Sequence, residues 1–163
     1  MDNFALLQSW ISSLAQLLGI EMEFDENRVC TVVFGEDICL SLALCEGNDD
    51  AFIVTGLVLA LTMDPVVDNS IFRAVLKMNF LGSETGYGGV LGLGLYDGMI
   101  IFAHTLYFGE CDEILLQNVM QNAAHNIGCF RDAIHRYLEN EMESRSKVQE
   151  TVINPLLMYG NFV

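Results

Sequence analysis

The side chains best suited to chemistry in this sequence are three histidines and five cysteines. His125 and Cys129 stand four residues apart, so on a helix they would share one face and could offer two ligands to a metal ion. A metal site needs about two more donors, and no CxxC motif or pair of histidines four apart supplies them. The pattern predicts ordinary histidines and reduced, mostly buried thiols, with no metal site.

A glycine cluster, GSETGYGGVLGLG, spans residues 82–94 and invites comparison with a nucleotide-binding loop. Such loops need a GxGxxG or GxxxxGK[ST] spacing, and they open a helix whose amides hold the phosphates. Neither spacing is present, no lysine is nearby, and the cluster leads into an apolar strand pattern. We expect a loop followed by a closely packed strand, and no nucleotide or other cofactor.

Catalytic motifs are also missing from the sequence. There is no GxSxG, no reactive-cysteine signature and no isolated pair of acids in an apolar run. We therefore predict a protein without catalytic residues. A small enzyme whose site is assembled from dispersed residues is the alternative that motifs leave open.

The excess of acidic over basic side chains argues against two classes of partner, nucleic acids and anionic membranes. The 22 acidic and 7 basic side chains give a net charge of −15, and no Lys or Arg precedes Arg28 or lies between Lys77 and Arg131. Nucleic acids and anionic membranes both require a basic surface, so neither is expected as a partner. The N-terminus lacks a basic signal region, and the longest apolar run, Ala51–Met63, is shorter than the roughly 20 residues of a membrane helix. We expect a cytoplasmic protein without membrane insertion.

Hydrophobic periodicity predicts an α+β domain with a twisted antiparallel sheet, in the order helix, three strands, helix, two strands, helix. The third strand is apolar on both faces, which is typical of a central strand. The expected elements cover residues 4–18, 29–34, 38–45, 51–61, 71–80, 90–96, 99–108 and 113–142. A chain of 163 residues has room for one domain, which we place at residues 1–142. We expect residues 143–163 to be a C-terminal tail that is frayed or contributed to a partner.

The second helical segment is apolar around most of its circumference. Its two stripes are Ile71, Val75 and Met78 on one side and Phe72, Leu76 and Phe80 on the other. A short helix of this kind has to be buried on more than one face. In a small domain, contact with a second subunit is a natural way to bury the second face. We predict a homodimer, because one stripe or the other would otherwise be exposed, and we place the first stripe together with Phe72 at its interface.

Short motifs along the chain carry a family resemblance. The first helix has paired leucines, a tryptophan and a closing Leu-Gly; FDENRVC (residues 24–30) enters the first hairpin; LKMNFLG (residues 76–82) ends the second helix; and Tyr96-Asp97-Gly98 turns the last hairpin. With these motifs and a pI near 4.2, the chain resembles the class I type III secretion chaperones, the family of the translocated intimin receptor chaperone, over residues 4–140. Its long tail and glycine-rich stretch depart from the common pattern.

The resemblance implies a bacterial cytoplasmic chaperone that binds the N-terminal segment of one or more secreted effectors, keeps it non-globular and delivers it for export. It also implies a homodimer in which the second helix and the last two strands meet across a two-fold axis, and it makes the secretion-system ATPase a candidate partner. A regulatory antagonist on the same fold, which sequesters a regulator, is the main alternative.

We place the effector-binding surface on the first helix and on the outward faces of the first two strands. The helix has a wider apolar face than one sheet can cover, and each strand keeps an apolar second face, so part of this surface should be free for a partner. The predicted binding residues are Phe4, Leu7, Trp10, Ile11, Val32, Phe34, Cys39 and Ala43.

Overall fold

The computed structural model describes residues 2–81, 89–94 and 98–158, and for Leu81 and residues 145–158 it describes the backbone alone. Five antiparallel strands form one sheet in the order β1-β2-β3-β5-β4, which confirms the predicted element order and the central place of the third strand. The elements are α1 (Asn3–Leu18), β1 (Val29–Phe34), β2 (Ile38–Cys45), β3 (Asn48–Ala60), α2 (Pro65–Leu81), β4 (Gly89–Leu93), β5 (Met99–Tyr107) and α3 (Glu113–Met158).

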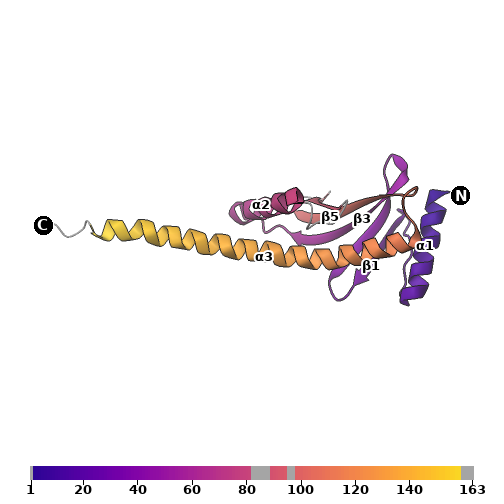
Figure 1. Cartoon of the computed structure of the whole chain (residues 1–163), viewed down its shortest axis with the longest axis horizontal. Helices are drawn as coiled ribbons and strands as arrows, with labels where there is room; N and C mark the ends of the chain where they lie inside the picture. Colours follow the sequence, from indigo (N-terminus) through magenta and orange to yellow (C-terminus); the bar gives the residue numbers. More distant parts are fainter. Residues whose placement is uncertain (1, 82–88, 95–97, 159–163) are drawn as a thin grey trace.

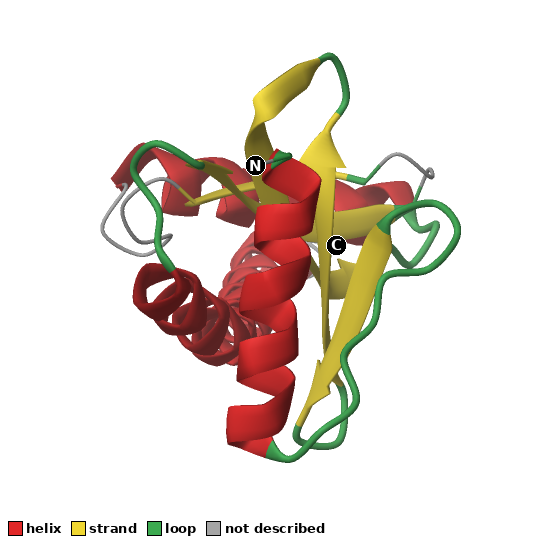
Figure 2. Ribbon diagram, turned by 90° about the vertical axis from the view of Figure 1, so that its right-hand side faces the viewer, coloured by secondary structure: helices red, strands yellow, loops and turns green. Residues whose placement is uncertain are grey.

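Two helices cover one face of the sheet. Helix α3 runs along this face, mainly over β2 and β3, and α1 crosses at one end of the sheet (Figure 1). Figure 2, seen from that end, shows α1 in front with α3 leading away behind it. Helix α2 packs beside β4 and α3. The opposite face of the sheet carries neither α1 nor α3.

Helix α2 begins at Pro65, earlier than the sequence pattern indicated. The carboxylate of Asp64 accepts a hydrogen bond from the N–H of Val66 (2.8 Å), and proline fits the first helical turn because its missing N–H would have no partner there. Asp68, in the first turn of the helix, accepts hydrogen bonds from the N–H and the hydroxyl of Thr62, each 2.9 Å long. The helix therefore begins six residues before the expected start at Ile71.

Helix α3 continues to Met158, beyond its expected end near Met142, and its C-terminal part runs past the sheet (Figure 1). Residues 143–154 include Glu, Arg, Lys and Gln, which are good helix formers, and no glycine. The high helix propensity of these residues thus continues the helix beyond the point where the apolar periodicity ends. The domain boundary after residue 142 stays a prediction. Within the described ranges, no helix combines the length and the apolar character needed to cross a membrane.

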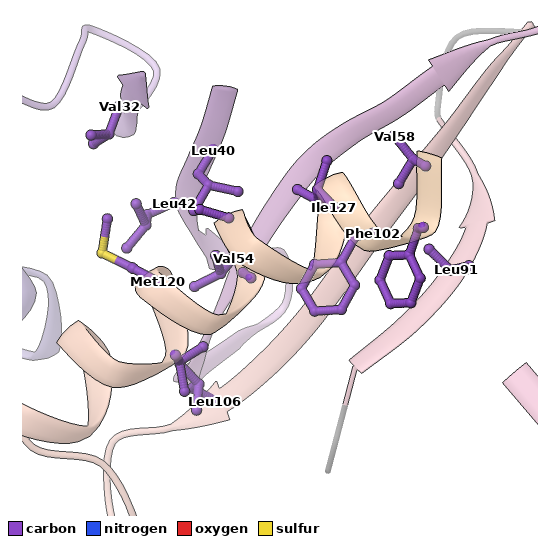
Figure 3. Packing of buried hydrophobic residues seen from close by; sticks show 14 of the residues in the cluster. Val32, Leu40, Leu42, Val54, Val58, Leu91, Phe102, Leu106, Met120 and Ile127 are labelled. Atoms are coloured by element: carbon purple, nitrogen blue, oxygen red, sulfur yellow. The ribbon is translucent and has the colours of Figure 1, made fainter. Parts of the chain in front are cut away.

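The core lies between the sheet and the two helices that cover it (Figure 3). Leu40 and Leu42 of β2 and Val54 of β3 point toward α3, where Met120 lies beside Leu42, and all are buried together with Ile127. Gly56 allows this close approach, because a Cβ there would lie 2.4 Å from Cδ1 of Ile127 and 2.7 Å from Cδ2 of Leu40. The contact between β3 and α3 thus requires a glycine.

Arg131 ties α3 to the strands at a β-bulge. The register of β3 against β5 shifts between Leu57 and Leu59, and there the carbonyls of Leu57 and Val58 accept hydrogen bonds from Arg131, 3.1 Å and 2.7 Å long. The same guanidinium forms an ion pair with Asp37 in the turn between β1 and β2. One side chain therefore fixes the β1–β2 hairpin relative to α3.

Candidate partner-binding surfaces

Helix α1 uses its central apolar stripe to complete the core. Asp2 caps the helix by accepting a hydrogen bond from the N–H of Phe4 (3.3 Å), and Leu7, Ile11 and Leu14 are then spaced to face the sheet, where they are almost fully buried. The prediction that Leu7 and Ile11 are exposed to a partner is therefore wrong for the folded chain. They belong to the single-chain core.

The two aromatic residues of α1 flank this stripe and keep part of their surface exposed. The ring of Phe4 meets Phe24 edge-on, with centroids 5.0 Å apart, and carries the guanidinium of Arg28 4.9 Å from its centre. The ring of Trp10 lies 5.9 Å from that of Phe108. Both residues are half-buried, so contact of Phe4 and Trp10 with a partner stays a prediction.

The C-terminal end of α1 exposes apolar side chains that the predicted binding residues did not include. Leu17 is 66% exposed, and Leu18 and Ile20 are also exposed on either side of the capping glycine, Gly19. The sequence signal that could have predicted this patch is Leu-Leu-Gly-Ile at the end of the helix, residues 17–20. Two adjacent leucines and an isoleucine beyond the cap cannot all point toward one sheet.

The β1–β2 hairpin has two faces with different roles. Val32 pairs with Leu40, and both are buried beneath the helices, while Phe34 is half-buried on the same side. Cys39 and Ala43 lie on the other, open side. The prediction that Val32 is exposed is therefore wrong, and the four predicted hairpin residues do not form one surface. A shift of one residue in pairing register exchanges the faces, and the strand patterns alone do not fix that register.

The open face of the sheet, opposite α1 and α3, is uncharged over its central part. Pairing places the hydroxyls of Thr31 and Ser41 3.2 Å apart on this face, and beside them Val33 is 60% exposed. In a chain with a net charge of −15, an open sheet face without charged side chains is a candidate partner surface. Its residues are Val29, Thr31, Val33, Cys39, Ser41, Ala43, Ile53, Thr55, Leu57, Val90, Gly92, Ile101, Ala103 and Thr105.

The strand order leaves β1 and β4 at the two edges of the sheet. On the outer side of β1, Phe24 bridges Cys30, and the N–H of Asp25 donates to the carbonyl of Val29 (3.0 Å). Beyond that bridge, no strand among residues 2–81, 89–94 and 98–158 pairs with the outer side of β1. Such an edge can accept hydrogen bonds from an added strand.

Helix α2 buries one apolar stripe within its own chain and exposes the other. The prediction that the first stripe forms a dimer interface is wrong, because its residues pack into the core between β4 and α3. On the opposite side Leu76 is 68% and Phe80 89% exposed, and Phe72 is half-buried. The buried residues are Ile71, Val75 and Met78.

Few of the described side chains are suited to chemistry. The side chains that the structure describes include no cluster of three or more His, Cys, Asp or Glu residues that could hold a metal ion. Nε2 of His125 and Sγ of Cys129 lie 3.6 Å apart on the exposed side of α3. All five cysteines are free, and burial raises the pKa of the Cys30 and Cys111 thiols to about 11, so both are protonated and weakly nucleophilic at neutral pH.

Comparison with known proteins places these surfaces in context. A model of the Tir chaperone protein (CesT) family matches residues 9–126, from α1 into α3. This chain is similar to one in the ExsC-ExsE complex, with a TM-score of 0.66 and 14% identity over 81% of this chain and 96% of that one. The HopA1-SchA chaperone-effector complex contains a chain with a TM-score of 0.60 and 16% identity, over 79% and 95%.

A third solved structure is that of the Yersinia pestis type III secretion chaperone SycH in complex with a stable fragment of YscM2. Its TM-score is 0.54 and its identity 17%, over 76% of this chain and 98% of that chain. At such identities the structural likeness establishes a shared fold. The match to the family covers most of the sequence.

Proposed function

This chain belongs to the Tir chaperone protein (CesT) family, and from that premise we propose that it is a type III secretion chaperone that binds the N-terminal segment of one or more secreted effectors. The bound segment stays non-globular and is delivered for export, with the secretion-system ATPase as a further partner. The observation that carries the binding role is the uncharged open face of the sheet beside the free part of the β1 edge. The protein acts by binding and performs no reaction.

An extended effector segment would make two kinds of contact with the hairpin. Its backbone would pair with β1 beyond the Phe24 bridge, through main-chain hydrogen bonds that do not depend on its sequence. Its side chains would then alternate between the open face, beside Val33, and the helix side, beside Phe34. The first contact gives affinity for many segments, and the second selects apolar ones.

Helix α1 supplies a second apolar area for the same segment. Phe4 and Trp10 are half-buried, and Leu17 at the C-terminal end is largely exposed. Exposed apolar groups such as these gain about 25 cal/mol for each Å² that a partner removes from water. In this proposal the effector segment continues from the β1 edge across α1.

We also propose that two copies form a homodimer through the exposed stripe of α2. Full burial of a side chain such as Phe stabilises by roughly 1.5–3 kcal/mol relative to exposure, and Phe80 is 89% exposed in the single chain. A two-fold axis beside α2 would bring Leu76 and Phe80 of each copy against the partner's stripe. Phe72, half-buried at its side, completes this interface.

The test is co-purification with mass spectrometry from the bacterium that encodes the chain, with secretion blocked so that effectors accumulate. We expect one or a few secreted proteins, captured through their N-terminal segments, and loss of capture when Val33 on the open face is changed to Glu. A transcriptional regulator as the dominant partner would favour the regulatory antagonist instead. The absence of any bound protein would contradict both.

A further inference from the structure

The outer edge of β4 is closed by a side chain from α2. Nδ2 of Asn79 donates to the carbonyl of Leu91 (2.7 Å), and Oδ1 of Asn79 accepts from the N–H of Leu91 (2.8 Å). Consecutive residues of a strand direct their N–H and C=O groups to opposite sides, so Leu91 directs both groups outward, away from β5. The carboxamide of Asn79 therefore occupies the position that a peptide group of an additional strand would take.

Without such a cover, β4 would be an attractive template for another strand. It is short and apolar, with the sequence GVLGL, and its Val90 and Leu93 side chains are exposed. Edge strands of this kind promote pairing between copies unless the chain blocks them. Leu91 lies at the middle of β4, so a strand that cannot bond to Leu91 loses the central pair of hydrogen bonds on this edge.

We propose that Asn79 is a specificity residue that closes the β4 edge, so that an added strand pairs with the sheet at β1. The first part, that the β4 edge is closed, is a property of this chain without any partner. The second part, that a partner strand is added at β1, rests on the proposed function. Asn79 holds its position because the buried Val75 and Met78, in the turn that precedes it, anchor α2. The helix thereby fixes the carboxamide against a strand that lies beyond it in the sequence.

The chemistry of the side chain explains why the residue is asparagine. A carboxamide has both a donor and an acceptor, as a peptide group does. Aspartate at position 79 would keep the acceptor for the N–H of Leu91 but would place a carboxylate against its carbonyl. Leucine, which has a similar size, would offer neither group. The two hydrogen bonds are partly buried, where an unpaired N–H or C=O is costly.

The experiment compares Asn79→Leu and Asn79→Asp with the unmutated full chain in the absence of any effector. Asn118→Leu is the matched control, because Asn118 is an exposed asparagine of α3 and its replacement adds the same apolar group. Amide hydrogen exchange at Leu91 is measured by NMR, and the size distribution by sedimentation velocity over a range of concentrations. At the lowest concentration, where copies do not pair, we expect Asn79→Leu to speed exchange at Leu91 by about fivefold, the effect of one lost hydrogen bond.

The same variant should form species larger than the unmutated protein, in proportion to concentration, through pairing of β4 strands between copies. Unchanged exchange at Leu91 or an unchanged size distribution would overturn the proposal, and so would a lower unfolding midpoint with no change in size. If Asn79→Leu does not fold, Asn79→Asp decides by the same two measurements. Failure of both to fold would show a residue required for folding and would also overturn it. Because no effector is present, these outcomes are independent of the co-purification test.

Discussion

Replacement of Gly56 by alanine should destabilise the chain, because the position has no room for a methyl group. The added Cβ would lie 2.4 Å from Cδ1 of Ile127 and 2.7 Å from Cδ2 of Leu40. Both side chains are 0% exposed, so their ends cannot turn toward water and α3 must shift away from the sheet. Overpacking of this kind costs about 1–3 kcal/mol. The lower entropy of the unfolded alanine chain returns roughly 0.4–1 kcal/mol, so the midpoints of the two ranges leave a net loss of about 1.3 kcal/mol.

Gly92→Ala is the matched control, since a Cβ at Gly92 meets no atom within 4 Å and should leave stability unchanged or slightly higher. The assay is equilibrium urea unfolding at one fixed protein concentration, because association contributes to the measured stability. Ile127→Val removes the Cδ1 atom that the alanine would touch. Alone it should cost about 0.5–1.5 kcal/mol, and in the Gly56→Ala chain it should cost less. Wild-type stability of Gly56→Ala, or the same cost of Ile127→Val in both chains, would refute this account of the packing.

Three further predictions concern the surfaces and the thiols. Phe80→Asp should give a folded monomer by sedimentation, because Phe80 is 89% exposed in the single chain; an unmutated protein that is monomeric at micromolar concentration would contradict the dimer. Val33→Glu should abolish effector capture and leave the unfolding temperature nearly unchanged, because Val33 is 60% exposed. Leu7→Glu should instead prevent folding, because it places a charge in the core. A folded Leu7→Glu protein would show that Leu7 does not belong to the core. The exposed Cys129 should react with a thiol reagent much faster than the buried Cys30, whose pKa of about 11 leaves roughly one thiolate in a thousand at pH 8. The reaction rate of Cys30 should rise with pH until about pH 11. Equal rates for the two thiols at pH 8 would contradict the burial of Cys30.

The order of the elements was predictable because its signals are local. Alternating residues mark β2, an unbroken apolar run marks β3, and helical spacing marks α1. These patterns also placed β3 at the centre of the sheet, as the strand order confirms. Asp97, half of the turn expected before β5, lies outside the described residues. The length of α3 was missed because helix propensity continues after the apolar stripe ends.

The division between core and surface was harder to predict because it depends on contacts between elements. The stripes of α2 are equally apolar in sequence, and only the packing against β4 and α3 buries Ile71 and leaves Phe80 in water. Likewise, the pairing of Val32 with Leu40 decides which side of the hairpin faces the helices. Asn79 was visible only as a polar residue on an apolar helix. Its role required the position of α2 relative to the β4 edge.

The most direct test of the central claim is hydrogen exchange with mass spectrometry on the purified complex, compared with each partner alone. The claim is that an effector segment lies non-globular along the β1 edge, the open sheet face and α1. We predict increased protection on this chain at β1 and at the C-terminal end of α1, and little protection along the effector segment except where it pairs with β1. A captured effector that is protected throughout as a folded domain, or protection on this chain confined to α2, would contradict the claim.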